Sequence, residues 1–424
     1  MTDVTRRNLL GYGAAAGSGA LVGLAGGFAG GFAVGDATAD DMGGDVVDLS
    51  KAYPFYASSA DVAAGVAHQA GISTPPQRHC VFMTFDVVPG TTKQQLQVLF
   101  ARWSAGIAQL MAGLPVGAVE PTNGVQPPGD TGEAFDLAPS SLTVTFGIGP
   151  GIFDERFGLS SKAPVRLAPL PQLPSDSLDP ALTGGDLSLQ ACADDPQVAY
   201  HAIRDLARIG RGTVTTRWTV MGFGRASAGA GQTTPRNLLG FKDGTRNLRT
   251  ADEIDDFVWV GDDEPSWFHG GAYMVARKIQ MNIEVWDTDR ISDQEKIFGR
   301  HKQSGAPLTG TLEFDTPNFT ATEAGDSVID VKSHIALASH ENNDGVRILR
   351  RGYNFTDGIN DLGHLDAGLL FISYQHDPAS FITLQTRLGS SDLLNEYIKH
   401  VGSGIFAVPP APAQGHYFAE ALFS

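Results

Sequence analysis

The order of β-like and helix-like segments in the first half of the chain is the feature that most constrains its fold. Four runs rich in β-branched and aromatic residues cover residues 80–86, 142–146, 186–192 and 213–221. Two segments with helical apolar spacing cover residues 93–111 and 194–208, and Asp195 and Pro196 are typical of a helix start. This order predicts a ferredoxin-like βαββαβ unit, in which two helices cover one face of a four-stranded antiparallel sheet.

The second half of the chain follows a similar plan. Its β-rich runs cover residues 272–286, 347–353, 369–374 and 405–408, and its helical patterns cover residues 289–300 and 379–388. The halves share no sequence period, so the parallel is one of structure. We therefore expect an α+β protein with two ferredoxin-like domains. The expected division is a wrapping segment at 40–78, domains at 79–224 and 239–424, and a Gly/Ala/Ser/Thr-rich linker at 225–238.

The first 39 residues have the composition of a signal peptide. The paired arginines of TRRNLL, at residues 5–10, precede an uncharged Gly/Ala-rich stretch over 11–35, and Ala37, Thr38 and Ala39 offer a cleavage site. This pattern predicts export of the folded protein by the twin-arginine machinery to the periplasm, the cell surface or the medium. An uncleaved N-terminal anchor is the less favoured alternative, because the glycine-rich stretch is only weakly apolar.

Charge and cysteine usage exclude several classes of partner. The formal net charge of −17 argues against nucleic acid or an anionic membrane surface, because phosphate would be repelled. Cys80 and Cys192 lack the CxxC and CxxCH spacings, which disfavours a thiolate zinc site and covalent attachment of haem. We expect two buried thiols, with a disulfide as the alternative if their strands lie side by side.

Three residues in the second half carry complementary chemistry. Asp243 lies in a glycine-flanked turn, GFKDGTRN at residues 240–247, and His334 and Arg350 follow it along the chain. A carboxylate can move a proton, a neutral imidazole can hold a metal, and a guanidinium is a permanent cation. These are the parts that a haem peroxidase requires.

The segment 240–244 resembles the GxxDG signature of the dye-decolorising-type (DyP) haem peroxidases. Five further segments resemble that family in the same order: 184–192 (GGDLSLQAC), 201–206 (HAIRDL), 348–355 (ILRRGYNF), 368–375 (GLLFISYQ) and 406–410 (FAVPP). The resemblance runs from about residue 75 to the end of the chain. It implies two ferredoxin-like domains, with non-covalent haem b bound in the C-terminal one between a helix and the sheet.

The resemblance also implies which residue ligates the iron. His334 lies sixteen residues before Arg350, as the proximal histidine segment of the family does, and is the expected axial ligand. His340 and His301 are the alternatives. A metal-bound histidine usually donates its other N–H to a carboxylate. Asp392 and Glu396 are the candidates for that carboxylate, and we favour Asp392.

Peroxide activation is assigned to Asp243 and Arg350. Asp243 would move the proton, and the cation of Arg350 would stabilise the departing oxygen. Neighbouring side chains of a strand point to opposite faces, so only one of Arg350 and Arg351 can face the haem. Alignment with the family selects Arg350, and Arg351 is expected to be a structural ion-pair partner.

Other residues are expected to complete the site. Leu369 and Phe371 share one face of a strand and would form an apolar lid, with plain core packing as the alternative. Three polar residues are candidates to bind the haem propionates: Asn247, Arg277 and Arg300.

The expected function is that of a secreted peroxidase, which uses hydrogen peroxide to oxidise phenols or dye-like donors in one-electron steps. The alternative is a deferrochelatase-like component of iron uptake that handles haem or releases its iron, because exported members of the family resemble proteins linked to iron uptake. A third interpretation is a binding scaffold without haem. The sequence leaves open whether the chain forms a homo-oligomer.

Overall fold

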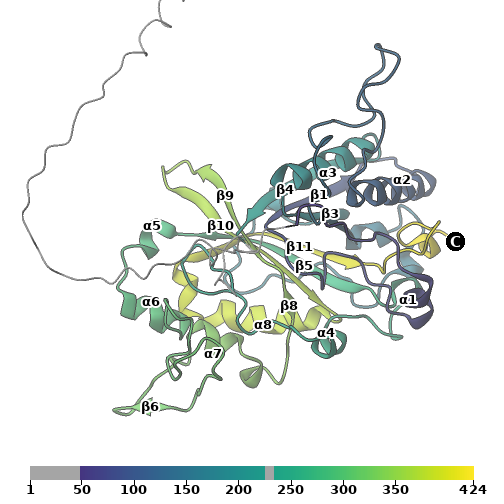
Figure 1. Ribbon diagram of the computed structural model, residues 1–424. Helices are drawn as coiled ribbons and strands as arrows, with labels where there is room; N and C mark the ends of the chain where they lie inside the picture. Colours follow the sequence, from purple (N-terminus) through teal and green to yellow (C-terminus); the bar gives the residue numbers. More distant parts are fainter. Residues whose placement is uncertain (1–47, 225–233) are drawn as a thin grey trace, which may run out of the picture. The chain divides into compact units, whose positions relative to one another are not determined.

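The fold is built around a closed ring of antiparallel strands (Figure 1). The computed structural model describes residues 48–224 and 234–424, and in them nine strands form one sheet in the order β5-β11-β2-β3-β1-β4-β9-β10-β8. β5 also pairs with β10, so that eight of these strands close on themselves and β8 lies outside the ring. The strands are β1 (His79–Val87), β2 (Thr143–Ile148), β3 (Leu187–Ala193), β4 (Val214–Phe223), β5 (Ala272–Met281), β8 (Leu349–Arg350), β9 (Tyr353–Ile359), β10 (Leu365–Gln375) and β11 (Ile398–Val408).

The remaining elements are helices and one small hairpin. The α-helices are α1 (Ser59–Ala64), α2 (Lys93–Met111), α3 (Pro196–Ile209), α4 (Ala251–Phe257), α5 (Ile283–Trp286), α6 (Ile291–Phe298), α7 (His334–Ala338) and α8 (Pro378–Ser391). The hairpin strands are β6 (Thr322–Glu323) and β7 (Asp326–Ser327). The 3₁₀-helices are η2 (Pro150–Phe153), η3 (Ser160–Lys162), η4 (Pro180–Leu182), η5 (Ser266–Phe268), η6 (His340–Asn342), η7 (Leu393–Glu396) and η8 (Glu420–Leu422). No helix in the described ranges is both long enough and apolar enough to cross a membrane.

Two ferredoxin-like units can be traced within the ring. The first has the strand order β2-β3-β1-β4, and α3 packs on β1 and β3 beside α2. The second has the order β11-β5-β10-β9, and α8 packs on β5 and β10. The expected α+β class with antiparallel pairing is therefore confirmed. The two units do not carry separate sheets, however, because β4 pairs with β9 and β2 pairs with β11.

The predicted helices of the first half are confirmed, and their ends have local causes. Thr92 and Gln95 form a capping box at the start of α2, so that the helix covers the predicted 93–111. Asp195 accepts hydrogen bonds from the backbone N–H groups of the first turn of α3, with Pro196 at the first helical position. Both starts follow from residues adjacent in sequence, so the pattern alone could place them.

Two predicted strands of the second half are each divided in the structure. The run 272–286 is not one strand: β5 ends at Met281 and α5 begins at Ile283. Trp286 is buried there against Tyr397 and donates from Nε1 to the carbonyl of Leu239, and this tertiary packing overrides the β propensity of the run. The run 347–353 is also divided, into β8 and β9, which keep one register along β10.

Alternate side chains of the ring strands enter two different cores. One core lies under α2 and α3 and includes Val81 of β1, whereas Phe82 enters the core inside the ring. The ring core also takes side chains from β3, β4, β5, β9, β10 and β11. The segment before β1 ties both halves together, since Gln69 donates to the carbonyls of Phe146 and Pro409. The predicted signal peptide, 1–39, lies outside the described residues, as does most of the predicted linker.

Candidate active site

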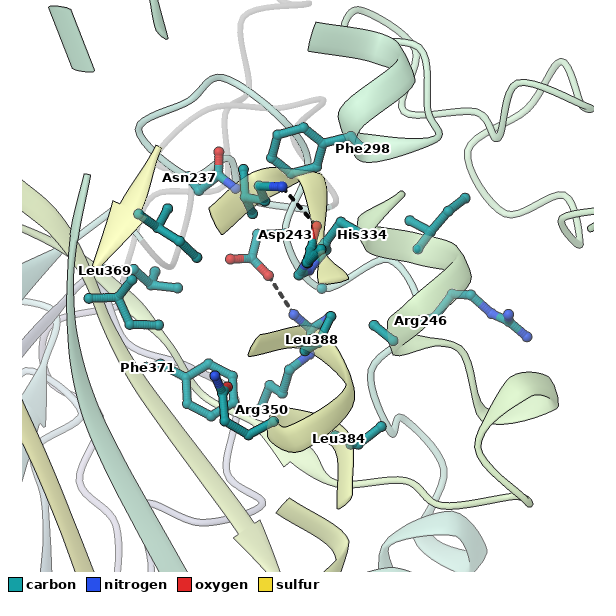
Figure 2. Close-up of a pocket in the computed structure, with 18 of the residues that line it drawn as sticks. Asn237, Asp243, Arg246, Phe298, His334, Arg350, Leu369, Phe371, Leu384 and Leu388 are labelled. Atoms are coloured by element: carbon teal, nitrogen blue, oxygen red, sulfur yellow. Dashed lines mark hydrogen bonds and ion pairs between the residues drawn. The ribbon is translucent and has the colours of Figure 1, made fainter. Parts of the chain in front are cut away.

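A large cavity lies in the second half of the chain, between β10 and the helices α7 and α8 (Figure 2). It encloses about 1580 Å³ of space free of protein atoms, its open mouth included. The loop 237–246 and the segment 346–350 complete the wall, and aliphatic side chains from α8 and β5 make much of the lining apolar. An apolar cavity of this kind with a few convergent polar groups is the usual form of a cofactor site.

His334 stands at one side of the cavity, at the start of α7. Its Nδ1 lies 2.7 Å from Oδ2 of Asp392, and the Asp392 side chain is only 2% exposed. A carboxylate can only accept, so Nδ1 carries the hydrogen and Nε2 keeps its lone pair. The other oxygen of Asp392 accepts from the backbone N–H of Leu394, which fixes the carboxylate. Glu396, the other carboxylate considered, is exposed.

The alternative histidines have different surroundings. His301 is not part of the cavity wall, and its Nδ1 pairs with Glu295 at 3.1 Å. His340 does line the cavity, beside the exposed edge where Glu341 lies 3.5 Å from its Nδ1. Burial lowers the pKa of His340. Of the three, His334 alone combines a place in the cavity wall with a buried carboxylate partner.

Asp243 and Arg350 form an ion pair in the cavity wall, with 2.7 Å between Oδ1 and Nη1. Figure 2 shows this pair beside Leu369 and Phe371. Gly240 and Gly244 flank the acid with φ angles of 86° and 125°, a region that favours glycine. A Cβ on Gly240 would also come within 2.7 Å of the Lys302 side chain. The glycines therefore let the turn carry Asp243 into the cavity.

Leu369 and Phe371 extend from β10 into the cavity, whereas Leu370 between them is buried in the ring core. Phe371 packs against Phe381 of α8, with 6.0 Å between the ring centres. The two side chains therefore lie at the boundary of the cavity, next to the Asp243–Arg350 pair, where they can restrict the access of water.

The three candidates for propionate binding have different positions. Asn247 does not line the cavity, so the structure gives no support to the expectation that it contacts the cofactor. Its side-chain amide donates to the backbone carbonyl of Arg350 at 2.7 Å and accepts from the backbone N–H of Arg350 at 2.8 Å. Both groups of the amide are used locally, so Asn247 holds the Arg350 backbone instead.

Arg277 and Arg300 do line the cavity, and both are buried. Arg277 is paired with Asp176 and donates to Ser403, so much of its charge is already compensated. Arg300 donates to the carbonyls of Gly305 and Glu313. Burial, and to a smaller extent repulsion from Arg246 and Arg350, lowers the pKa of Arg300 to about 10. An anionic partner would therefore stabilise the charged form of Arg300.

Several residues of the cavity were missed from the sequence. His400 is 4% exposed, and burial and the neighbouring Arg277 lower its pKa to about 3. Its Nδ1 has no hydrogen-bond partner among the described residues, and Gln385 lies 3.2 Å from Nε2. At the rim, Arg246 pairs with Glu341 and Arg347 pairs with Glu253. The predicted last strand began at residue 405, so nothing in the pattern marked His400 as part of a buried strand.

The expectation for Arg351 also needs correction. Its side chain does not line the cavity, and within residues 48–224 and 234–424 it has no carboxylate partner, so the expected ion pair is not found there. The guanidinium is 2% exposed and donates to the carbonyl of Thr74 and to the side-chain oxygen of Gln77.

The donor set fits haem. A histidine with a free Nε2 and a buried carboxylate partner suits iron, the apolar walls suit a porphyrin, and buried cations suit carboxylate substituents.

Comparison with known proteins agrees with this chemistry. The family models "Dyp-type peroxidase, N-terminal" and "Dyp-type peroxidase, C-terminal" match residues 69–224 and 234–413. The chain belongs to the Dyp-type peroxidase family. As a member it is a peroxidase with non-covalently bound haem as its cofactor, which confirms both expectations.

Individual relatives cover nearly the whole chain. A deferrochelatase of Yersinia pestis is 38% identical over 98% of this chain and 94% of its own length. A deferrochelatase of Escherichia coli K12 is 40% identical over 84% of this chain and 85% of its own. Ferric DtpA from Streptomyces lividans superposes with a TM-score of 0.80 at 36% identity, covering 88% of this chain and 98% of that one.

Proposed function

We propose that this protein is an exported peroxidase whose haem occupies the cavity, with His334 as iron ligand and with Asp243 and Arg350 acting on hydrogen peroxide. The donors would be phenols or dye-like aromatics. The observation that carries the proposal is the pairing of His334 with a buried carboxylate at one side of the cavity that the Asp243–Arg350 pair also lines. The bound haem supplies the iron at which peroxide is reduced and the oxidising equivalents are held.

Each protein group has a defined task in this proposal. Nε2 of His334 would bind the iron, and the Asp392 carboxylate would make the imidazole a stronger donor. The Asp243 carboxylate would take a proton from hydrogen peroxide and return it to the leaving oxygen. Arg350 would stabilise the negative charge on that oxygen, because its guanidinium stays charged and is held by its own backbone contacts with Asn247. Leu369 and Phe371 would limit water.

The test of this proposal is the absorption spectrum of variants. Haem-loaded protein should show the Soret band of a histidine-ligated haem, and His334→Ala should lose that band or most of the bound haem. His340→Ala and His301→Ala are matched controls that should keep both. A histidine-type spectrum retained in His334→Ala and lost in one of the controls would contradict the assignment.

A second function, the release of iron from haem, rests on the curated relatives that are named deferrochelatase. Removal of iron leaves a metal-free porphyrin, which fluoresces where haem does not. We would incubate the haem-loaded protein without peroxide and follow porphyrin fluorescence together with iron captured by a chelator. Equal amounts of the two products would support this function, and intact haem at the end of the incubation would count against it.

Export is part of the proposal through residues 1–39, which lie outside the described structure. The TRRNLL sequence supports the twin-arginine route, and the final location would be the periplasm, the cell surface or the medium. Because this route carries folded proteins, the cofactor would be inserted before export.

A further inference from the structure

Two cysteines, an arginine and a tyrosine meet inside the ring of strands. Cys80 of β1 and Cys192 of β3 are direct partners in the antiparallel register, and their side chains are 1% and 0% exposed. Arg351 follows β8 and Tyr353 begins β9, and they are 2% and 1% exposed. None of the four lines the cavity that we assign to haem. The cluster is therefore separate from the proposed site.

Arg351 is a buried cation without a carboxylate partner among the described residues. Its guanidinium donates to the carbonyl of Thr74 and to the side-chain oxygen of Gln77, and its Nε has no hydrogen-bond partner. A guanidinium does not lose its proton in a protein, and a buried charge is costly unless an opposite charge compensates it. The surroundings of Arg351 should therefore supply an anion.

Cys192 is the group best placed to be that anion. The hydroxyl of Tyr353 donates to its Sγ over 3.4 Å, and the thiol of Cys80 is also a hydrogen-bond partner. Burial by itself would raise the pKa of Cys192, but the hydrogen bond with Cys80 and the charge of Arg351 lower it to about 6. The nearby acids are less suited, because burial raises the pKa of Cys80, Tyr353 and Tyr374.

Cys80 and Cys192 are direct cross-strand partners, and their side chains share a hydrogen bond. Residues directly opposite on antiparallel strands have Cβ atoms about 4.5–5.5 Å apart, and a disulfide needs about 3.5–4.5 Å. A small adjustment of β1 against β3 would therefore suffice. Close to the pair, the hydroxyl of Tyr374 donates to the side chain of Gln190, which lies on the same strand β3.

We propose that Cys192 and Cys80 form a peroxide-oxidised thiol pair, with the Cys192 thiolate as the attacking group and Cys80 as the resolving group. The Cys192 sulfur attacks one oxygen of hydrogen peroxide, the O–O bond breaks, and hydroxide leaves, so that Cys192 becomes a sulfenic acid. The Cys80 sulfur then bonds to the Cys192 sulfur, the S–O bond breaks, and water leaves with the Cys80 proton. Two electrons pass from the thiols to the peroxide, which is the oxidant that the peroxidase activity of the family uses.

This proposal does not depend on where haem binds, because the thiols react with peroxide directly. The Arg351 cation is what makes Cys192 the nucleophile, since only the thiolate attacks peroxide. The hydrogen bond with Cys80 and the Arg351 cation both lower the pKa of Cys192 and so favour its thiolate form. Loss of the cation would raise that pKa again, which would reduce the thiolate fraction and hence the oxidation rate.

The experiment uses the full chain prepared without haem, so that the cofactor cannot be the oxidant. After exposure to hydrogen peroxide, the protein is unfolded, free thiols are alkylated, and the peptides containing Cys80 and Cys192 are measured by mass spectrometry. We expect the two peptides to be joined, with the mass of two hydrogen atoms lost. Two fully alkylated thiols after the same exposure would overturn the proposal.

Two serine variants separate the roles of the thiols, and each replaces only one sulfur by oxygen. Cys80→Ser should leave a sulfenic acid on Cys192 that dimedone captures, whereas Cys192→Ser should give no adduct on Cys80. The opposite pattern would overturn the assignment of the attacking group. Arg351→Lys should keep most of the rate of adduct formation on Cys192 in the Cys80→Ser background, and Arg351→Met should lower it. An unchanged rate in a folded Arg351→Met protein would exclude the role of the cation.

Discussion

The pairing of His334 with Asp392 gives a prediction that can be worked out in magnitude. Replacing Asp392 by Asn removes the negative charge but keeps one side-chain oxygen, which can still accept from the backbone N–H of Leu394. The bond from His334 is 2.7 Å long, and its acceptor is 2% exposed while the His334 side chain is 30% exposed, so solvent screens it only in part. Hydrogen bonds to charged groups contribute about 1.5–3 kcal/mol. That free energy corresponds to a loss of roughly 10- to 150-fold in haem affinity.

The assay is a titration of haem-free protein with haem, followed by absorbance, for the wild type, Asp392→Asn and Glu396→Gln. Glu396 is the matched control, because it is the other carboxylate near in sequence and is exposed. We expect the dissociation constant to rise about 10- to 100-fold in Asp392→Asn, in line with other carboxylate–histidine–metal groups. The Glu396→Gln value should not change. Equal affinities in the wild type and Asp392→Asn, or a larger loss in Glu396→Gln, would refute the reasoning.

Three further predictions follow from the site and the N-terminus. In stopped-flow mixing with hydrogen peroxide, Arg350→Leu should slow the reaction by about 10²–10³-fold and Asp243→Ala by about 10²–10⁴-fold, both with haem retained. Normal rates in both variants would remove the proposed mechanism, and a defect in Arg351→Leu alone would mean that the wrong arginine was assigned. His400 has a pKa of about 3 in the folded protein, below its unfolded value near 6.5, so the unfolded state binds the extra proton. The free energy of unfolding should therefore fall by up to about 1.4 kcal/mol per pH unit as pH falls from 6.5 towards 3. Denaturant unfolding of haem-free protein at several pH values should show a smaller fall in His400→Gln than in the wild type, and equal falls in the two proteins would contradict this. Replacement of Arg6 and Arg7 by Lys should retain folded precursor in the cytoplasm, and continued secretion in a fractionation experiment would exclude the twin-arginine route.

Local sequence signals allowed the first half of the fold to be predicted. The starts of α2 and α3 depend on Thr92 and on Asp195 with Pro196, which act on residues within one turn. The break between β5 and α5 could not be predicted, because it depends on Trp286 packing against residues more than forty positions away in sequence, such as Leu239 and Tyr397. Closure of the ring was missed for the same reason, since it is made by strand pairs from different halves.

The sequence could name those residues of the candidate site whose side chains have one characteristic chemical use. An acid between two glycines, a histidine and an arginine at family spacing could be named from the chain, and the structure brings Asp243 to Arg350 and His334 to Asp392. The sequence could not show the local role of Asn247, because an amide can bind backbone as readily as a ligand, and only the geometry shows that both of its groups bond to the Arg350 backbone. His400 was missed because its burial depends on packing that no local pattern records.

Closure of the ring also limits how the chain can be divided. If the chain were cut between its halves, the first unit would expose the edges of β2 and β4, and the second unit would expose the edges of β9 and β11. Unpaired strand edges are templates for aggregation, so neither half is suited to exist alone. The seams are short, with one register pair between β2 and β11 and two between β4 and β9. Thermal opening should therefore begin at these seams, and mechanical resistance should be lowest where they lie.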